Sequence, residues 1–317
     1  MIYFLFILGF LFLIKGADML VDGASVIARK LRVSDMVIGL TIVSFGTSMP
    51  ELVVTLISNL NGNSDLAIGN ILGSNIANTL LILGIAAIIY ALPINKSTAL
   101  SEIPFTLIAT LLLGFLANAA LFTSSKNLSI SRIDGFILLF FFVLFMAYIF
   151  QLSSATRKTD TAKTVHAPLW KPILFIVVGL AGLYFGGKWI VEGAIFFSRS
   201  SGMSESFIGL TIVAVGTSLP ELVTSAMAAY KKNAAIAVGN VVGSNIFNIL
   251  WILGFSAAIK ELPFDLISNT DIVMIIISSS LLLICVSLGK KKAIVRWQGI
   301  LFVLIYIGYL YYLVQRG

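Results

Sequence analysis

The 317-residue sequence has little charge, a single cysteine and a single histidine. Asp, Glu, Lys and Arg together make up 11% of the residues, whereas they make up about 25% of an average soluble domain. A soluble fold has no means of covering the apolar side chains, which reach 59% of the sequence. The lone Cys285 excludes an intrachain disulfide, and the lone His166 lies in a polar segment, where it forms no metal-ligand or catalytic pattern. The sequence therefore predicts an all-α polytopic membrane protein.

Apolar runs of about 20 residues recur along the chain, and each is long enough to cross a hydrocarbon core about 30 Å thick. The first run has no basic residues ahead of it and no small-residue cleavage site, so we expect it to be retained as a span rather than removed as a signal peptide. We predict ten transmembrane helices, at 2–26, 36–58, 67–91, 102–122, 132–152, 171–197, 206–229, 236–258, 271–289 and 295–314.

Lys and Arg residues are concentrated in one of the two alternating sets of connections between these runs. That set carries 14 of the 21 basic residues, and the other set carries 5. Excess positive charge in short loops marks the cytoplasmic side. We therefore expect a cell (inner) membrane protein with both termini outside and the linker at 153–170 in the cytoplasm. The net charge of +7 is then a topology signal, and nucleic acid is not expected as a partner.

The second half of the sequence repeats the first at an offset of 170 residues. "IGLTIVSFGTSMPELV" from Ile38 aligns with "IGLTIVAVGTSLPELV" from Ile208, and "GNILGSNIANTLLILG" from Gly69 aligns with "GNVVGSNIFNILWILG" from Gly239. Each half carries five spans, an odd number, so the second copy must enter the membrane from the opposite side. We predict two inverted five-helix repeats, with the site near the midplane where they meet, as in many transporters. The domains are then the first repeat at 1–152, the short linker at 153–170 and the second repeat at 171–317.

Each copy of the first motif places a carboxylate, two hydroxyls and a proline inside an apolar run. Thr47 and Ser48 precede Glu51 by four and three residues, so the three side chains project from one helical face. Pro50 offers no N–H and its ring clashes with the preceding turn, which frees backbone oxygens around Ser44. The same donor types recur in the second copy and in the other matched segments, as Thr217, Ser218 and Glu221, Ser74 with Asn78, and Ser244 with Asn248.

Summed over both halves, these residues offer carboxylate, hydroxyl, amide and carbonyl oxygens, without thiolate or imidazole. Oxygen sites with two negative charges suit hard cations, Ca²⁺ above all, with Na⁺ as the competitor. Glu51 and Glu221 have no basic residue within a turn or two of their own helices, which favours ion binding over a structural ion pair. Structural ion pairs are instead expected from helical spacing between Lys15 and both Asp18 and Asp22, and between Lys188 and Glu192.

The doubled "GTSxPE" and "GSNIxN" forms resemble the signature of the cation/calcium exchanger (CaCA) superfamily, and most of all its sodium/calcium exchanger branch with the short prokaryotic members. The resemblance covers both halves. It implies a secondary active antiporter that exchanges calcium for sodium by alternating access, and not an enzyme. It implies no cofactor, only the transported Ca²⁺ and Na⁺, with the lipid bilayer as surroundings. We expect the chain to function as a monomer and to lack the long regulatory domain that eukaryotic relatives insert between the halves.

The resemblance also implies roles for individual residues. Asn78 matches the usual amide of the first repeat, whereas many sodium/calcium exchangers have Asp at the position of Asn248. Calcium ligands are implied at Glu51 and Glu221, assisted by Thr47 and Thr217. Sodium ligands are implied to include also Ser48, Ser218, Ser74 and Ser244, with backbone oxygens from Ser44 and Ala214.

The two carboxylates account for obligatory exchange. An empty site would carry about two negative charges through a low-dielectric barrier, at a cost of several kcal/mol, so only a loaded carrier should switch. The same fold could instead exchange calcium for protons by protonating both glutamates. From another class of protein, an intramembrane enzyme could use paired glutamates as acid and base, but the sequence has no nucleophile–base pair and no intramembrane histidine. A channel would conduct ions without a counter-ion.

Overall fold

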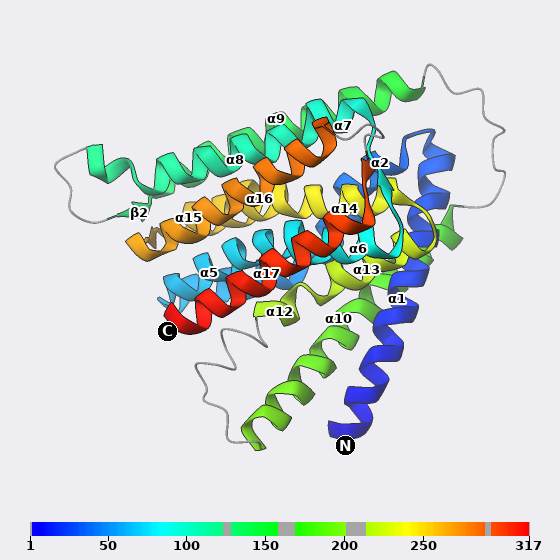
Figure 1. Ribbon diagram of the computed structural model, residues 1–317, viewed down its shortest axis with the longest axis horizontal. Helices are drawn as coiled ribbons and strands as arrows, with labels where there is room; N and C mark the ends of the chain where they lie inside the picture. Colours follow the sequence, from blue (N-terminus) through cyan, green and yellow to red (C-terminus); the bar gives the residue numbers. More distant parts are fainter. Residues whose placement is uncertain (1, 123–127, 158–168, 201–213, 289–292, 317) are drawn as a thin grey trace.

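The computed structural model describes residues 2–122, 128–157, 169–200, 214–288 and 293–316, and these are almost entirely helical (Figure 1). Helices are expected because backbone polar groups in hydrocarbon must be satisfied within the segment itself. The linker residues 158–168, with His166, lie outside the described part of the chain. Before the linker the elements are α1 (Ile2–Leu31), α2 (Asp35–Ile38), η1 (Gly39–Val43), α3 (Ser44–Thr47), α4 (Met49–Leu60), α5 (Ser64–Ile76), η2 (Ala77–Ile82), α6 (Leu83–Ile89), β1 (Leu92–Pro93), α7 (Lys96–Leu100), α8 (Glu102–Ala117), η3 (Ala119–Phe122), β2 (Ser129–Ile130) and α9 (Arg132–Arg157).

Two pairs of two-residue strands tie the part of the chain after the linker to the first part. β1 pairs antiparallel with β4, and β2 pairs antiparallel with β3, so each pair joins loops from the two halves. The elements here are α10 (Trp170–Ser200), α12 (Ala214–Thr217), α13 (Leu219–Tyr230), α14 (Ala234–Ile246), η5 (Phe247–Leu253), α15 (Gly254–Ile259), β3 (Leu262–Pro263), η6 (Leu266–Ser268), α16 (Asn269–Leu288), β4 (Ala293–Ile294) and α17 (Arg296–Arg316).

Within the described residues, eight helices are long and apolar enough to cross a membrane. The number becomes nine if the bent pair Asp35–Thr47 and Met49–Leu60 is one span. Each agrees with a predicted span to within five residues at either end. The remaining predicted span, 206–229, begins in residues that lie outside the described part, so the expected total of ten stays a prediction.

The two spans that carry the "GSNIxN" segments form the centre of the molecule. Of an 18-residue apolar stretch in Ser64–Ile89 and in Ala234–Ile259, 78% and 94% of the residues are buried, against 22–44% in the other six spans. Of the outer helices, α17 packs against α6 and α9 packs against α15, which are the last parts of these two spans, and α8 packs against α16. The "GSNIxN" segments therefore lie in the most buried of the described spans.

Helices α1 and α10 lie side by side and are inclined to the other long helices (Figure 1). Glycines bring their backbones into direct contact: a Cβ on Gly16 would lie 2.7 Å from the carbonyl oxygen of Gly179, and a Cβ on Gly186 would lie 2.7 Å from that of Gly9. Close packing of this kind is how small residues hold membrane helices together. The two contacts are equivalent in the repeat, because the 170-residue offset relates Gly16 to Gly186 and Gly9 to Gly179.

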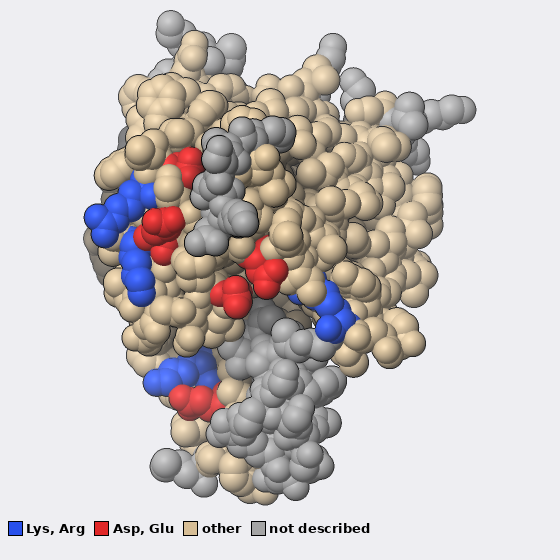
Figure 2. All heavy atoms as spheres, turned by 90° about the vertical axis from the view of Figure 1, so that its left-hand side faces the viewer, with Lys and Arg blue, Asp and Glu red and all other residues tan. Residues whose placement is uncertain are grey.

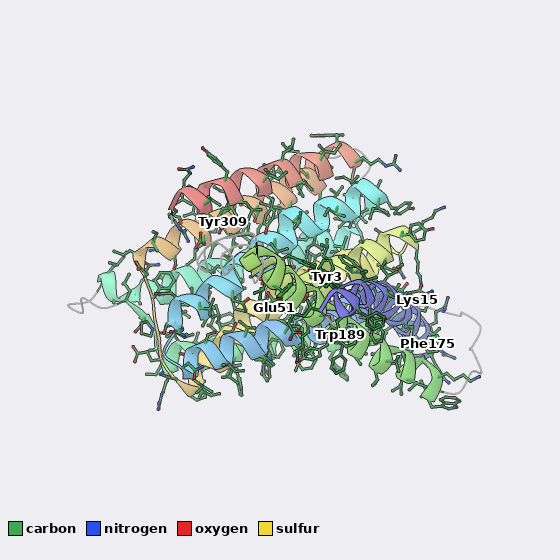
Figure 3. The ribbon with its side chains drawn as sticks, turned by 90° about the horizontal axis from the view of Figure 1, so that it is seen from below. Tyr3, Lys15, Glu51, Phe175, Trp189 and Tyr309 are labelled. Carbon is green, nitrogen blue, oxygen red and sulfur yellow. The ribbon has the colours of Figure 1, made fainter. Side chains whose placement is uncertain are left out.

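Helix α10 of this pair covers the motif glycines. A Cβ on Gly46 would meet the Leu180 side chain at 2.5 Å, and one on Gly216 would meet the Val191 side chain at 2.3 Å. Both contacted residues belong to α10, so the glycines of the two "GTS" segments are needed for this helix to pack over them. In Figure 3, Lys15 and Trp189 lie on this helix pair, whereas Glu51 lies among the other helices.

Charged side chains on the described surface are few, as Figure 2 shows for one end of the molecule. The expected pair Lys188–Glu192 is present at 3.8 Å. The expected pairing of Lys15 with Asp18 and Asp22 is wrong, because both aspartates contact Lys231 instead, at 2.6 and 2.7 Å. Lys231 lies in the turn between α13 and α14 and therefore connects α1 to the centre of the molecule.

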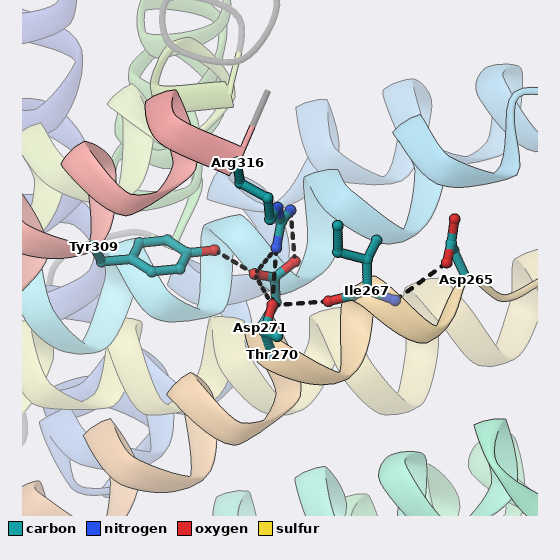
Figure 4. A network of polar contacts seen from close by, with 6 residues as sticks. All are labelled: Asp265, Ile267, Thr270, Asp271, Tyr309 and Arg316. Carbon is teal, nitrogen blue, oxygen red and sulfur yellow. Dashed lines mark hydrogen bonds and ion pairs between the residues drawn. The ribbon is translucent and has the colours of Figure 1, made fainter.

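A polar network fastens the end of the last helix (Figure 4). Asp271, near the start of α16 and only 4% exposed, accepts hydrogen bonds from Tyr309 Oη and Arg316 Nη1, each at 2.9 Å. The Arg316 guanidinium compensates the charge of the buried carboxylate. The network therefore joins α16 to α17 by a paired charge.

Candidate cation-binding site

Each "TSxPE" segment forms a helix break. Ser48 (φ −83°, ψ 8°) separates α3 from α4, which are bent by 46°, and Ser218 (φ −86°, ψ 6°) separates α12 from α13 in the same way. The proline follows in the first helical turn, where its missing N–H would have had no helical acceptor. Glu51 and Glu221 thus lie in the first turns of α4 and α13, where the helix dipole stabilises negative charge.

The two carboxylates are bound by hydroxyls from the opposite half of the chain. Ser48 Oγ donates to Glu221 Oε1 at 2.8 Å, and Ser218 Oγ donates to Glu51 Oε1 at 3.1 Å. Both glutamates are 1% exposed, and the described residues provide neither with an ion-pair partner. The sequence grouped each carboxylate with the hydroxyls of its own helix; the structure pairs them crosswise.

The serines of the "GSNIxN" segments complete these contacts. Ser244 Oγ lies 3.0 Å from Ser48 Oγ and donates to Glu221 Oε1 at 3.3 Å, while Ser74 Oγ lies 3.0 Å from Ser218 Oγ. All four predicted serines are therefore brought to the carboxylates, two to each.

Two asparagines that the sequence interpretation passed over hold the motif threonines. Thr47 Oγ1 donates to Asn240 Oδ1 at 3.1 Å, and Thr217 Oγ1 donates to Asn70 Oδ1 at 3.2 Å. Asn240 Nδ2 donates to the backbone carbonyl of Glu221 at 3.4 Å and to the hydroxyl of Ser225 on the same helix. Asn70 Nδ2 donates in the same way to the backbone carbonyl of Glu51 at 3.3 Å and to the hydroxyl of Thr55. The signal was available, because both asparagines follow the first glycine of the matched segments.

The predicted amides lie on π-helical segments at the centre of the molecule. Asn78 in η2 and Asn248 in η5 are each 1% exposed. Segment η2 packs against α13, which carries Glu221, and η5 packs against α4, which carries Glu51. A π-helical turn is unusual and often occurs at a functional site.

Four buried oxygen atoms around this centre have no hydrogen-bond partner within the described chain: Glu51 Oε2, Glu221 Oε2, Asn78 Oδ1 and Asn248 Oδ1. Each is an acceptor, and a buried acceptor without a partner costs free energy. A hard cation would satisfy oxygens of this kind. No group of three or more His, Cys, Asp and Glu side chains occurs in the described residues, so a site here depends on neutral oxygens as well as the two carboxylates.

The backbone oxygens differ from the sequence interpretation at one position. The Ser44 carbonyl accepts from the Ser48 backbone N–H at 3.0 Å, so the break has not freed it. This hydrogen bond forms because the chain keeps its helical course up to Thr47 and breaks only at Ser48. Ala214 is the first residue of α12.

Comparison with known proteins gives consistent matches over nearly the whole chain. The family described as sodium/calcium exchanger protein matches residues 1–151 and 171–315. CaxA of Alkalimonas amylolytica is 38% identical, and the sodium/calcium exchanger MaX1 of Methanosarcina acetivorans is 35% identical, each alignment covering 97% of both chains. The sodium-calcium exchanger NCX_Mj, in crystals soaked with 10 mM Na⁺ and zero Ca²⁺, superposes with a TM-score of 0.82 at 31% identity, covering 97% of this chain and 98% of that one.

Proposed function

Because the chain belongs to the sodium/calcium exchanger family, whose members are membrane transporters and not enzymes, we propose that it exchanges calcium for sodium as a secondary active antiporter. The observation that carries the proposal is the pair of buried glutamates, each with one oxygen bound by serines and the other without a partner among the described residues. Such a pair is costly to keep in a membrane protein unless an ion compensates it.

The proposed ligands follow from the free oxygens. Glu51 and Glu221 would hold Ca²⁺, with Asn78 and Asn248 adding neutral oxygens. The hydroxyls that now donate to the carboxylates can rotate and offer lone pairs to a cation instead. We assign this second role to Ser48, Ser218, Ser74 and Ser244, with Thr47 and Thr217 and the backbone oxygens of Ser44 and Ala214 as further ligands that shift into place on ion binding.

Two carboxylates account for coupling without any further machinery. One Ca²⁺ balances both charges, and so do two Na⁺; a third Na⁺ would leave one net positive charge. The unloaded site carries about two negative charges, and moving them past the apolar barrier costs several kcal/mol. The carrier therefore changes access only when loaded with one ion or the other, so the inward passage of sodium drives the exit of calcium.

We propose the architecture that the 170-residue offset describes: ten spans in two inverted five-helix repeats, 1–152 and 171–317, with the linker 153–170 in the cytoplasm and both termini outside. The crosswise contacts support it, since Ser48–Glu221 becomes Ser218–Glu51 under this offset. The inclined pair α1 and α10 would move against the remaining helices to alternate access, because α10 packs over Gly46 and Gly216, two residues before the helix breaks at Ser48 and Ser218. The protein would act as a monomer in the inner membrane.

The test is ⁴⁵Ca²⁺ uptake into proteoliposomes loaded with sodium, compared with potassium-loaded vesicles and with a pH gradient alone. We expect uptake only with internal sodium. Glu51→Gln and Glu221→Gln should each abolish it while leaving the protein folded, because glutamine keeps the size and removes the charge. Glu102→Gln is the matched control, a fully buried carboxylate outside the site whose hydroxyl partner is Tyr148. Uptake driven by the pH gradient without sodium would establish calcium/proton exchange instead, and uptake in either site variant would refute the assignment.

A further inference from the structure

The asparagine of each "GSNI" segment contacts the opposite half of the chain. Asn75 and Asn245, 0% and 3% exposed, lie one turn before Asn78 and Asn248 on the two central helices. Neither has been given a role above, and neither has an unpartnered oxygen. Their hydrogen bonds determine which way the two neighbouring amides must face.

The first chain of hydrogen bonds begins at a backbone carbonyl. Asn75 Nδ2 donates to the Asn245 carbonyl oxygen at 3.3 Å, and because a carbonyl can only accept, the amide nitrogen of Asn75 must lie on that side. Its Oδ1 therefore faces Asn248 and accepts from Asn248 Nδ2 at 3.0 Å. The Asn248 oxygen is left on the other side, buried and without a partner in the described chain.

The second chain runs through a threonine. Thr79 Oγ1 donates its only proton to the Asn75 carbonyl at 3.1 Å, so it can only accept from Asn245 Nδ2, which lies 2.9 Å away. Asn245 Oδ1 then accepts from Asn78 Nδ2 at 3.0 Å. The Asn78 oxygen is in turn left buried without a partner in the described chain.

We propose that Asn75 and Asn245 are positioning residues that fix Asn248 and Asn78 with their oxygens, and not their NH₂ groups, available to the transported cation. The inference rests on the proposed function only for the identity of the ion. An amide turned the other way would present its positive end to the cation and weaken binding. The fixed orientation explains how a site with Asn at position 248 still offers an oxygen there.

The two chains differ in one element. Asn245 is connected to the backbone of the first half through the hydroxyl of Thr79. Asn75 instead donates directly to the backbone of the second half. The residue that the 170-residue offset relates to Thr79 is Ile249, which has no hydroxyl. Thr79→Val therefore removes the anchor of the Asn78 chain and leaves that of Asn248 in place. It keeps the size of a buried side chain and is the mildest available perturbation.

The first measurement follows the side-chain amides themselves, by NMR of the protein in detergent with ¹⁵N-labelled asparagine. Asn75→Leu should speed hydrogen exchange of the Asn248 amide about tenfold and leave that of Asn78 unchanged, because one buried hydrogen bond is lost. Thr79→Val should do the reverse. An Asn248 amide unaffected by Asn75→Leu, or both amides affected by each change, would overturn the proposal. This result does not depend on which ion is transported.

The second measurement is Ca²⁺ and Na⁺ binding by calorimetry in a double-mutant cycle. Asn75→Leu and Asn245→Leu should each weaken binding about tenfold. In an Asn248→Leu background, Asn75→Leu should have no further effect while Asn245→Leu keeps its own; an Asn78→Leu background should give the opposite pattern. Equal losses in every background would show a merely structural role and refute positioning. Amide exchange as expected in a parent protein that binds neither ion would uphold the positioning and refute the proposed function.

Discussion

Lys231 should hold α1 against the turn between α13 and α14, so its removal should release that helix. Its ammonium contacts Asp18 and Asp22 at 2.6 and 2.7 Å and also donates to the Asp18 backbone carbonyl at 3.1 Å. The Lys231 side chain is 24% exposed and the aspartates are 38% and 56% exposed. Ion pairs this accessible contribute at most about 1 kcal/mol each. Since the two pairs share one cation, we expect Lys231→Met to favour detachment by about 1 kcal/mol, or about fivefold in the equilibrium constant.

Pulsed electron spin resonance between labels at Ile14 on α1 and Tyr230 on α13, both exposed, measures this detachment in a Cys285→Ala background. Lys231→Met should enlarge the fraction of long distances about fivefold. Lys232→Met is the matched control, because this neighbouring lysine forms no ion pair within the described residues. Equal distance distributions for the two variants would refute the reasoning.

Salt and pH give an independent check. Burial lowers the pKa of Lys231, but the hydrogen bonds and charges of Asp18 and Asp22 outweigh it, so the pKa is raised from its ordinary value. A cation with a raised pKa contributes its full stabilisation below about pH 10.4 and loses it only as the pH rises through the folded-state pKa. The distances should therefore stay constant from about pH 6 to 9, whereas high salt should lengthen them.

Three further outcomes are expected. Gly16→Val should lower the thermal unfolding temperature, at a cost of about 1–3 kcal/mol, because its Cβ would lie 2.7 Å from a carbonyl oxygen of α10. Gly308→Val, with open space around the glycine, should not lower it. Equal shifts in the two variants would contradict direct backbone packing. Asp271→Asn should destabilise the protein by about 2 kcal/mol by leaving Arg316 without its charge partner, and Arg316→Gln in the same background should recover part of this loss. Single cysteines between 153 and 168 should be shielded from impermeant thiol reagents in intact cells and a cysteine at Asn63 should react; the opposite labelling would reverse the proposed orientation.

Hydropathy was sufficient to predict the eight or nine spans that the described residues contain, and the internal repeat singled out the serines and glutamates that the structure brings together, because both depend on local sequence. The crosswise pairing of Ser48 with Glu221 was beyond them. Helical spacing compares side chains on one helix, and the break at Ser48 directs its hydroxyl to the other half of the chain. Tertiary packing decides that direction, and the sequence carries no local record of it.

Two other differences have similar causes. Asn70 and Asn240 were passed over, although their equal placement in both repeats was visible in the sequence; their contacts with the motif threonines come from packing between helices of opposite halves. Lys15 was assigned to Asp18 from their spacing, but a base preceding an acid on a helix is the weaker orientation of such a pair. Lys231, distant in sequence, reaches both aspartates from the side and replaces it.

The crosswise contacts make the duplicated halves dependent on each other in inheritance as well as in structure. A substitution that removes the Ser48 hydroxyl deprives Glu221, in the other copy, of its closest donor, and the loss of Ser218 does the same to Glu51. After the duplication, neither copy could drift at these positions without a compensating change in its twin. The near-identity of two segments 170 residues apart, in a chain that otherwise diverges between its halves, is what such mutual constraint would leave behind.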